Sequence, residues 1–346
     1  MSEMLAGEKN SKMLRNTPIS REGSRGTRKV ARPPSMARKG YEVTAARLKW
    51  GFIWLMGRSR GGRNFPVFPD DVFIVSYPRS GNTWTRFLIA NLIYPEEAIT
   101  FANIEQKIPD VYKNTRRQLL QTPRPRVLKS HEYFDPRYKK VIYIVRDPRD
   151  VALSYYHFAR KYRKVEDGYP LEGYISRFIA GEVDEYGSWK ENVASWLSTR
   201  QGSESFLLLR YEDLLEDTGR ELLKVASFLG IDRSPEQVAR AVELSSAGRM
   251  RDLEKKQADA WITTKKTRKD IAFVGTANSG GWRSLLPENL VAAIESTWGP
   301  LMESLGYHLA PVASESSRAP GQGVAWETPR ETATPVTASH GQKGEL

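Results

Sequence analysis

The most constraining feature of this 346-residue sequence is an apolar run that leads through a loop of small residues into a helical pattern. Residues 72–75 read Val-Phe-Ile-Val, residues 77–84 read Tyr-Pro-Arg-Ser-Gly-Asn-Thr-Trp, and residues 86–93 are mostly apolar. A buried strand, a short loop and a helix N-terminus favour bound anions, because the amides and the helix dipole point at the ligand. The pattern therefore predicts a phosphate-like anion site in an α/β fold.

The side chains of this loop indicate which anion it suits. Hydroxyl and amide groups offer hydrogen bonds, Arg79 offers a cation, and Trp84 offers a flat face for a ring. This combination predicts a nucleotide-like anion with an aromatic base. The loop residues that we expect to bind it are Arg79, Ser80, Gly81, Asn82, Thr83 and Trp84.

An ATP-binding loop is disfavoured, because such a loop ends in Gly-Lys followed by Ser or Thr. This loop has one glycine and no lysine before Thr83. A magnesium-dependent phosphotransferase stays open as an alternative, with Asp147, after the apolar run 141–145, on the metal. A non-catalytic binding protein is a second alternative.

Together with the segments that follow it, the loop resembles that of the soluble, cytosolic-type sulfotransferases. These enzymes use 3′-phosphoadenosine-5′-phosphosulfate (PAPS) as sulfuryl donor, and their loop reads Tyr-Pro-Lys-Ser-Gly-Thr-Thr-Trp. This chain matches six of the eight positions, with Arg79 in place of Lys and Asn82 in place of Thr. The resemblance covers about residues 64–308.

Further motifs occur in the order that the family has them. Lys129-Ser130-His131 is similar to the family's Lys-Thr-His, which implies that His131 is the catalytic base and that Lys129 contacts the sulfuryl group. Arg146 and Ser154 stand where the family clamps the cofactor's 3′-phosphate.

Three later segments resemble the family less specifically. Tyr211 begins a Tyr-Glu-Asp motif whose tyrosine approaches the adenine in the family, and Ser245 begins the next adenine-side segment. Residues 280–283, Gly-Gly-Trp-Arg, are similar to the family's Gly-Asp-Trp-Lys.

One departure concerns the segment before Trp282. The family has Phe-x-Arg-Lys-Gly, whereas residues 273–277 read Phe-Val-Gly-Thr-Ala and lack both cations. The backbone amides of Gly275 and Thr276 could replace the missing cations as contacts to the 3′-phosphate. Alternatively, the protein binds its cofactor poorly. A third is substitution by nearby cations, namely Lys265, Lys266, Arg268 or Lys269.

The chemistry explains these residue types. Sulfuryl transfer resembles phosphoryl transfer, in which charge moves onto the leaving oxygen in a loose, in-line transition state. Arg79 and Lys129 supply the cations that this requires, so no metal is needed. His131, with an ordinary pKa of about 6.5, suits proton removal from an attacking hydroxyl. His157, within a helical pattern, is interpreted as a packing residue.

Apolar strands that alternate with helices predict an α/β, P-loop-like three-layer sandwich, with a central parallel sheet and helices on both faces. We expect strands near 72–76, 126–129, 141–145 and 205–210. The expected helices lie near 83–94, 148–163, 189–200, 214–229, 235–244 and 287–305. The predicted domain spans residues 64–310, between a basic, mostly disordered segment 1–63 and a disordered tail 311–346.

The net charge of +12 does not indicate nucleic-acid binding, because residues 1–63 hold 15 Lys and Arg against 4 Asp and Glu, or +11 of it. This segment includes a candidate amphipathic helix, which leaves open a weak contact with a membrane surface or a protein. The chain has no cysteine, which fits the cytoplasm, and no apolar run long enough to span a membrane. A homodimer is also left open.

The acceptor is the least determined partner. Tyr112, Tyr162, Tyr169, Tyr174 and Phe178 suit an apolar or aromatic alcohol, so we expect a small hydroxylated molecule, or an amine. An acidic sugar is the alternative, because these loops also contain Arg116, Arg117, Arg124, Arg160, Lys161, Arg163 and Lys164.

Overall fold

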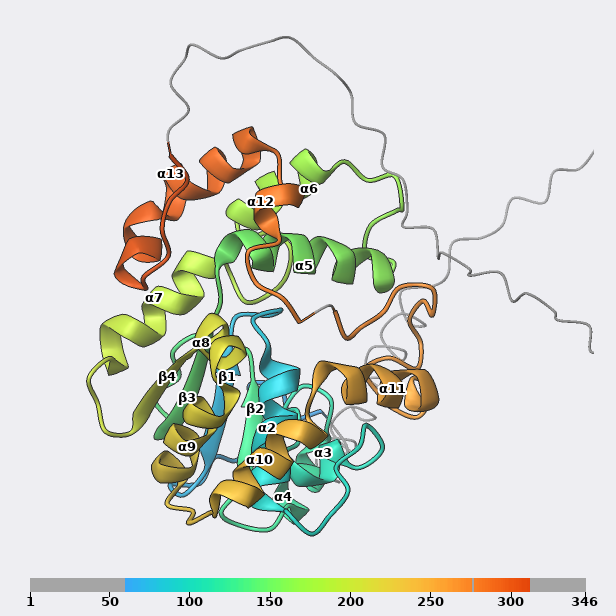
Figure 1. Cartoon of the computed structure of the whole chain (residues 1–346), viewed down its shortest axis with the longest axis vertical. Coiled ribbons are helices and arrows are strands. Elements are labelled where there is room, and N and C mark those ends of the chain that lie inside the picture. The colour runs from blue at the N-terminus through green and yellow to red at the C-terminus, as the bar shows by residue number, and fades with distance from the viewer. Residues whose placement is uncertain (1–59, 276, 312–346) are drawn as a thin grey trace, which may run out of the picture. The chain divides into compact units, whose positions relative to one another are not determined.

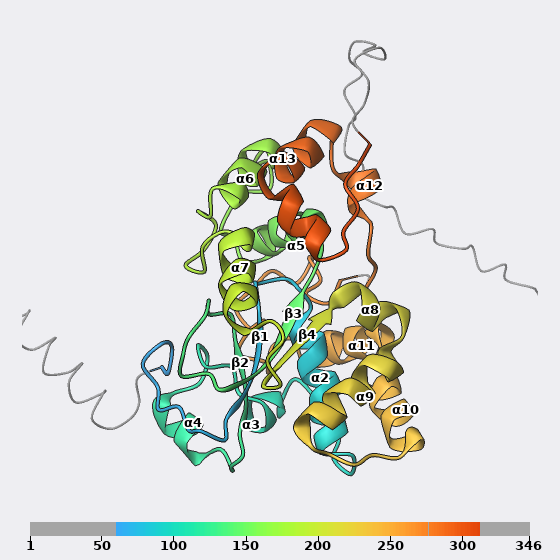
Figure 2. The same ribbon diagram turned by 90° about the vertical axis from the view of Figure 1, so that its left-hand side faces the viewer.

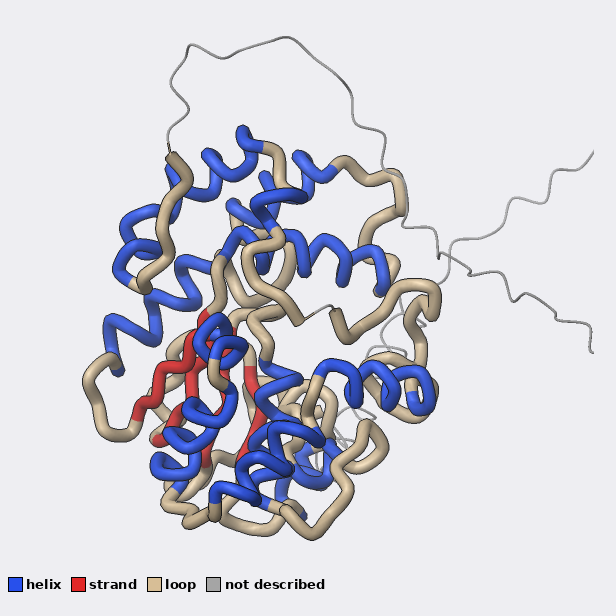
Figure 3. The backbone as a smooth tube through the Cα atoms, in the orientation of Figure 1, coloured by secondary structure: helices blue, strands red, loops and turns tan. Residues whose placement is uncertain are grey.

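The computed structural model describes residues 60–275 and 277–311, so most of the predicted N-terminal segment and C-terminal tail lie outside the described residues. Four parallel strands form one sheet in the order β2-β1-β3-β4 (Figures 1 and 3). The strands are β1 (Val72–Ser76), β2 (Val127–Ser130), β3 (Lys140–Val145) and β4 (Phe206–Arg210). All four strand predictions are confirmed to within one or two residues.

Helices surround the sheet. In chain order they are α2 (Asn82–Ile93), α3 (Ile104–Lys107), α4 (Arg116–Gln121), α5 (Pro148–Lys161), α6 (Leu171–Ile179), α7 (Trp189–Arg200), α8 (Tyr211–Glu216), α9 (Thr218–Leu229), α10 (Pro235–Leu244), α11 (Ala247–Gln257), α12 (Trp282–Leu285) and α13 (Glu288–Ser304). No helix among the described residues is long and apolar enough to cross a membrane.

Successive strand residues face two separate cores. Phe73 and Val75 of β1 pack in one core, with side chains of α5, α6, α7 and α13. Val72 and Ile74 pack in the other, with side chains of α2, α9 and α10. Figure 2 shows these two groups of helices on opposite sides of the strands. Because both faces of the sheet are covered, the strands are mostly apolar, with charged residues only near their ends. The predicted three-layer α/β fold is confirmed.

Two helix starts follow the expected cap chemistry. The side chain of Asp147 accepts a hydrogen bond from the backbone N–H of Arg149, with Pro148 at the first position of α5. Ser234 and Gln237 form a reciprocal capping box at the start of α10. Both contacts satisfy amides that a helix N-terminus leaves unpaired.

The predicted helix at 214–229 is wrong in its bounds, because two helices, α8 and α9, replace it. Asp217 has a non-helical backbone (φ −144°), and its side chain accepts a hydrogen bond from the N–H of Arg220 at 2.9 Å. The break is thus an N-cap within the predicted helix. Helix α8 begins at Tyr211, so the Tyr-Glu-Asp motif forms its first turn.

The parallel register brings all four strand ends to one edge. Val72 of β1 lies opposite Val127 of β2 and Lys140 of β3, and Val141 lies opposite Phe206 of β4. The residues that directly follow the strands therefore gather at this edge, which is where open α/β sheets bind ligands.

Residues 60–63 form a strap at the start of the described chain. The N–H groups of Gly61 and Gly62 donate to the carbonyls of Asn114 (3.0 Å) and Val111 (2.8 Å). Arg63 donates from Nε to Glu132 Oε2 at 2.7 Å, and Glu132 is the residue after His131. Residues 60–63 are thereby attached to the segment before β2 and to the residue that follows His131.

Candidate active site

A cavity of about 1220 Å³ opens at the carboxyl ends of the strands. It is lined by most of the predicted site residues: Arg79, Gly81, Asn82, Thr83, Trp84, Lys129, His131, Arg146, Ser154, Tyr211 and Gly275. Ser80 and Ser245 are fully buried behind the wall, and Thr276 lies outside the described residues. The fold thus gathers residues from four strand ends at one place.

The loop between β1 and α2 needs its glycine. Gly81 has a positive φ of 96°, and a Cβ there would lie 2.5 Å from the Tyr211 ring. Arg79 also has a positive φ of 70°, a conformation that non-glycine residues rarely adopt. Such strain concentrates at functional sites.

Asn82 turns its side chain inward. Its Nδ2 donates to Ser76 Oγ at 3.2 Å, with longer contacts to the carbonyls of Ile74 and Ser130. The amide therefore ties the ends of β1 and β2 together, while the hydroxyl of the neighbouring Ser80 is buried without a partner in the described part of the chain.

Arg79 is held between two rings. Its guanidinium carbon lies 5.0 Å from the Phe158 ring centre and 5.1 Å from that of Phe273. Its Nε donates to Ser154 Oγ at 3.2 Å. Burial lowers the pKa of Arg79, while the ring faces favour the cation.

Arg146 connects the two loops that flank the cavity. It donates from Nη1 to the carbonyl of Arg79 (3.3 Å) and from Nη2 to that of Asn278 (3.2 Å). Its guanidinium lies over the Tyr211 ring at 4.3 Å. Its Nε is buried with no hydrogen-bond partner among the described residues.

An aromatic corner adjoins Arg146. The Trp84 and Tyr211 rings meet edge to face with centroids 5.7 Å apart. Trp84 donates from its indole nitrogen to the carbonyl of Ser245 at 3.0 Å, and the Ser245 hydroxyl accepts from Asn91 at 3.0 Å. Ser245 thus supports the Trp84 ring and does not itself reach the cavity.

His131 is fixed in one tautomer. Its Nδ1 lies 2.8 Å from the carbonyl oxygen of Ser76. A carbonyl only accepts, so Nδ1 bears the proton and Nε2 keeps a free lone pair. Burial and the nearby Lys129 cation lower the pKa of His131 to about 3. The imidazole is therefore neutral at physiological pH and able to accept a proton.

Lys129 forms a buried ion pair that the sequence did not reveal. Its Nζ lies 2.7 Å from Asp110 Oδ2. Burial alone would raise the pKa of Asp110, but the cations of Lys129 and Arg86 hold it at about 2. Burial lowers the pKa of Lys129, and Asp110 opposes that shift. Asp110 has no sequence signal of its own, because it precedes β2 in an irregular segment.

The segment that lacks the family's two cations closes another side of the cavity. Asp150 accepts hydrogen bonds from the N–H groups of Gly280 (2.7 Å) and Trp282 (3.0 Å), which fixes the end of this loop. Ala277 has a positive φ of 53°. Arg251 donates to the carbonyl of Gly275 at 3.2 Å.

The cations suggested as substitutes lie elsewhere. Neither Lys265, Lys266, Arg268 nor Lys269 lines the cavity. Arg268 pairs with Asp167 and Asp270, because the loops that carry them fold beside it. The structure therefore does not support the idea that these four residues replace the two missing cations of the phosphate clamp.

The rest of the cavity wall is largely aromatic. Tyr112 and Tyr162 line it as expected, and Tyr155, Phe158, Tyr186 and Trp261 join them. Tyr174 and Phe178 are buried in the core instead, so that expectation was wrong. His157 was interpreted as packing, but it is exposed and lines the cavity, because its side of α5 faces away from the sheet.

The alternatives find less support. Of the basic residues suggested for an acidic sugar, Lys161 and Lys164 line the cavity, and Lys161 already donates to the carbonyl of Arg268 at 2.8 Å. Asp147 does not line the cavity, and its carboxylate is engaged by Arg149. In residues 60–275 and 277–311 no group of His, Asp and Glu could hold a metal ion.

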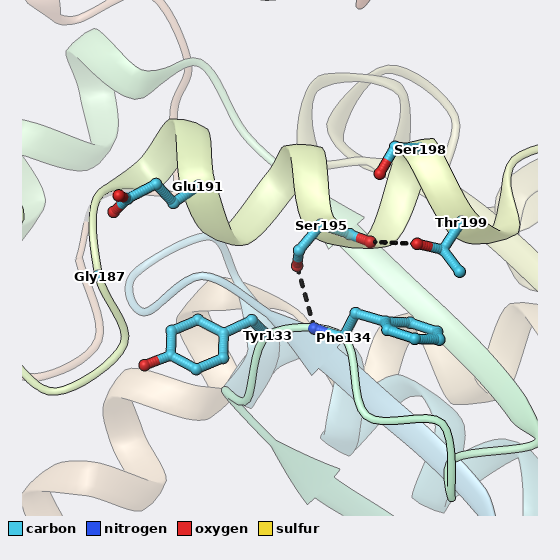
Figure 4. Close-up of a pocket in the computed structure, with 7 residues that line it drawn as sticks. All are labelled: Tyr133, Phe134, Gly187, Glu191, Ser195, Ser198 and Thr199. Carbon is cyan, nitrogen blue, oxygen red and sulfur yellow. Dashed lines mark hydrogen bonds between the residues drawn. The ribbon is translucent and has the colours of Figure 1, made fainter.

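A smaller surface pocket of about 570 Å³ lies beside α7 (Figure 4). Its wall consists of Tyr133, Phe134, Gly187, Glu191, Ser195, Ser198 and Thr199. Ser195 accepts from the N–H of Phe134 at 3.0 Å, and Glu191 caps α7 through Ser188. These polar groups serve the helix and its neighbouring loop, and the wall contains no cation, so the large cavity is the candidate site.

Comparison with known proteins agrees with this geometry. The family model for the sulfotransferase domain matches residues 69–306. Sulfotransferase 1A1 of Bos taurus is 33% identical over 238 residues, covering 64% of this chain and 79% of the bovine protein. The 3-beta-hydroxysteroid sulfotransferase of Cavia porcellus is 30% identical over 230 residues, covering 63% and 79%.

Solved structures share the fold. Retinol dehydratase in complex with androsterone and the inactive cofactor PAP has a TM-score of 0.60 at 22% identity, covering 69% of this chain and 82% of that chain. Mouse sulfotransferase SULT7A1 complexed with PAP has a TM-score of 0.57 at 24% identity, covering 69% and 85%. The resemblance inferred from the motifs is confirmed: the chain belongs to the sulfotransferase family.

Proposed function

We propose that this enzyme transfers a sulfuryl group from PAPS to a hydroxyl of a small acceptor, with His131 as the base. The geometry of His131 carries the proposal. Its proton is held on the Ser76 carbonyl, its Nε2 is free, and it shares a cavity with the anion loop and with Lys129. Structures of retinol dehydratase hold PAP together with androsterone or with retinol.

The residues around the anion loop fit a nucleotide donor. We call the part of the cavity formed by Arg146, Ser154, Tyr211 and the anion loop (residues 79 and 81–84) the donor half. It offers cations and ring faces for a base. PAPS supplies an activated sulfuryl group and a stable leaving phosphate. No residue here has to become covalently bonded, so the protein contributes position and charge.

The roles of the side chains follow from their charge. We call the part of the cavity formed by Tyr112, Tyr155, Asp184 and Tyr186 the acceptor half. His131 lies between the two halves, and its Nε2 would take the proton from the hydroxyl as the oxygen–sulfur bond forms. Arg79 and Lys129 would offset the charge that develops on the transferred and leaving oxygens.

The loop that lacks two cations affects binding more than chemistry. A charge-assisted hydrogen bond contributes about 1.5–3 kcal/mol, so the 3′-phosphate should be held less tightly than with a full set. Arg146, Ser154 and the backbone amide of Gly275 are the proposed remaining contacts. A thermal-shift comparison of PAP with ATP plus magnesium tests this: a shift with PAP supports the donor assignment, whereas a shift only with ATP and magnesium would indicate phosphotransfer.

Replacement of His131 by Ala tests the base directly. We expect turnover to fall by about 10²- to 10⁴-fold while PAP binding is retained, since general-base catalysis contributes that factor. His157→Ala separates the two histidines that share the cavity and should keep most of the turnover. Unchanged turnover in His131→Ala, or a greater loss in His157→Ala, would remove His131 from this role.

The location and assembly of the protein stay predictions. The absence of cysteine favours the cytoplasm. A homodimer, and a membrane or protein contact through residues 1–63, need separate measurement by sedimentation and by vesicle binding.

A further inference from the structure

Asp184 is a carboxylate in the cavity wall that the proposed transfer step does not use. It lies in the segment between α6 and α7 and lines the cavity together with Tyr155 and Tyr186. Two donors hold it in place: the Tyr155 hydroxyl donates to Oδ2, and the N–H of Tyr186 donates to Oδ1 at 2.7 Å. Its orientation is therefore fixed before any acceptor binds.

The charge of Asp184 is not neutralised by an ion pair. Among residues 60–275 and 277–311 no ion pair with Asp184 is found, although Lys164 is close enough to lower its pKa. Burial outweighs this and raises the pKa of Asp184. A carboxylate offers about four acceptor positions, of which two are used here. A partly buried carboxylate with spare acceptor capacity in a cleft indicates a ligand contact.

Asp184 is linked to the reaction centre through Tyr186. Tyr186, whose amide it accepts, has its ring centroid 5.6 Å from that of His131. The Tyr112 ring lies 5.3 Å from Tyr186 and 6.5 Å from His131. An acceptor whose hydroxyl meets His131 would thus lie against these rings, with Asp184 beyond them.

We propose that Asp184 determines acceptor specificity by accepting a hydrogen bond from a second donor group, an ammonium or a hydroxyl, that the acceptor carries away from the reacting hydroxyl. This inference rests on the proposed function and adds the substrate class: a ring-bearing alcohol or phenol with a distal donor. The rings of Tyr112 and Tyr186 would pack against the acceptor ring, and Asp184 would distinguish acceptors by their far end.

Three phenols that differ only at the far end provide the test: 4-ethylphenol, 4-(2-hydroxyethyl)phenol and tyramine. A hydrogen bond to a charged group should favour the donor-bearing phenols about tenfold or more in kcat/KM. In Asp184→Asn the ratio of kcat/KM between the donor-bearing phenols and 4-ethylphenol should fall toward one, most of all for tyramine, while PAP binding is retained. A loss of kcat/KM confined to tyramine would identify an ammonium as the preferred donor. An equal loss of kcat/KM for both donor-bearing phenols would show that a hydroxyl serves as well.

Control variants separate the role of Asp184 from that of the neighbouring acid and from the proposed acceptor class. Glu185→Gln removes the neighbouring acid, which lines the same cavity, and should leave the preference intact. Equal kcat/KM for the three phenols, or a preference that persists in both Asp184→Asn and Asp184→Ala, overturns the role of Asp184 alone. Failure to sulfate any of them while PAP binds overturns the proposed acceptor class together with it.

Discussion

The two halves of the cavity are built on different principles. The donor half is cationic, and its key groups directly follow strands: Arg146 comes after β3 and Tyr211 after β4. The acceptor half is made of rings and a carboxylate; Tyr112, Asp184 and Tyr186 come from irregular segments, and Tyr155 comes from α5. The sheet therefore fixes the groups that handle charge, whereas the loops present the groups that choose the acceptor.

The difference extends to the backbone. Both non-glycine residues of positive φ that line the cavity, Arg79 and Ala277, belong to segments that flank the donor half. Strained backbone is retained where the surrounding structure fixes it, and here Asp150 and Arg146 hold the loop that contains Ala277. Binding of a phosphate-like group depends on such exact placement, whereas ring packing in the acceptor half does not.

The largest expected effect concerns the buried ion pair of Lys129 and Asp110, which lies beside His131 where the two halves meet. Asp110→Ala leaves the Lys129 ammonium buried without its partner, which should lower the free energy of unfolding by about 3–5 kcal/mol. The double variant Asp110→Leu with Lys129→Met removes both charges and should recover most of that stability, though not turnover. Denaturant unfolding measures both, and a single variant as stable as the parent would contradict the buried pair.

A smaller effect would sharpen the comparison by acting on the donor half alone. Arg146→Ala should weaken PAP binding by about 10- to 150-fold, because one charge-assisted contact contributes about 1.5–3 kcal/mol. The KM for the acceptor should stay unchanged. Calorimetric titration with PAP measures the first quantity, with the exposed Arg240→Ala on α10 as control. Equal losses for donor and acceptor would mean that the halves are not separate.

Acid pH should lower the free energy of unfolding through His131, which lies between the two halves. The pKa of His131 is lowered to about 3 in the folded protein. Between about pH 6.5 and pH 3 the imidazole is therefore protonated in the unfolded chain but neutral in the folded chain. This contribution to stability is complete above pH 6.5 and is lost as the pH falls toward 3, at up to about 1.4 kcal/mol per pH unit. His131→Ala should flatten the slope in that range; an unaltered slope would contradict the buried neutral imidazole.

The smallest effect concerns the strained loop. Ala277→Gly should raise the free energy of unfolding by about 0.5 kcal/mol, since relief of a left-handed alanine slightly exceeds the entropy that glycine adds to the unfolded chain. The matched change Ala239→Gly, at an exposed position inside α10, should instead lower it by about 1 kcal/mol. Opposite signs in thermal unfolding support the strain, and equal losses would refute it.

Much of the donor half could be predicted from the sequence, because its residues adjoin apolar strands whose parallel ends must meet. The anion loop was predicted in this way, whereas the roles of Arg146 and His131 were implied by the resemblance of their motifs to those of the sulfotransferases. Asp184 and Asp110 could not be, because their partners come from tertiary folding: Lys129 is 19 residues from Asp110, and Tyr155 is 29 residues from Asp184. For the same reason Arg268 was misplaced, since its partner Asp167 is 101 residues away.

The strap at residues 60–63 has a practical consequence for anyone who shortens this protein. A boundary set at residue 64, where the family motifs predict the domain to begin, would delete Arg60 and Gly62 from the wall of the cavity. It would also delete Arg63, whose guanidinium holds the residue next to His131. A truncated protein for crystallisation or assay should therefore start upstream of residue 60, or its weakened turnover would be mistaken for a property of the catalytic groups.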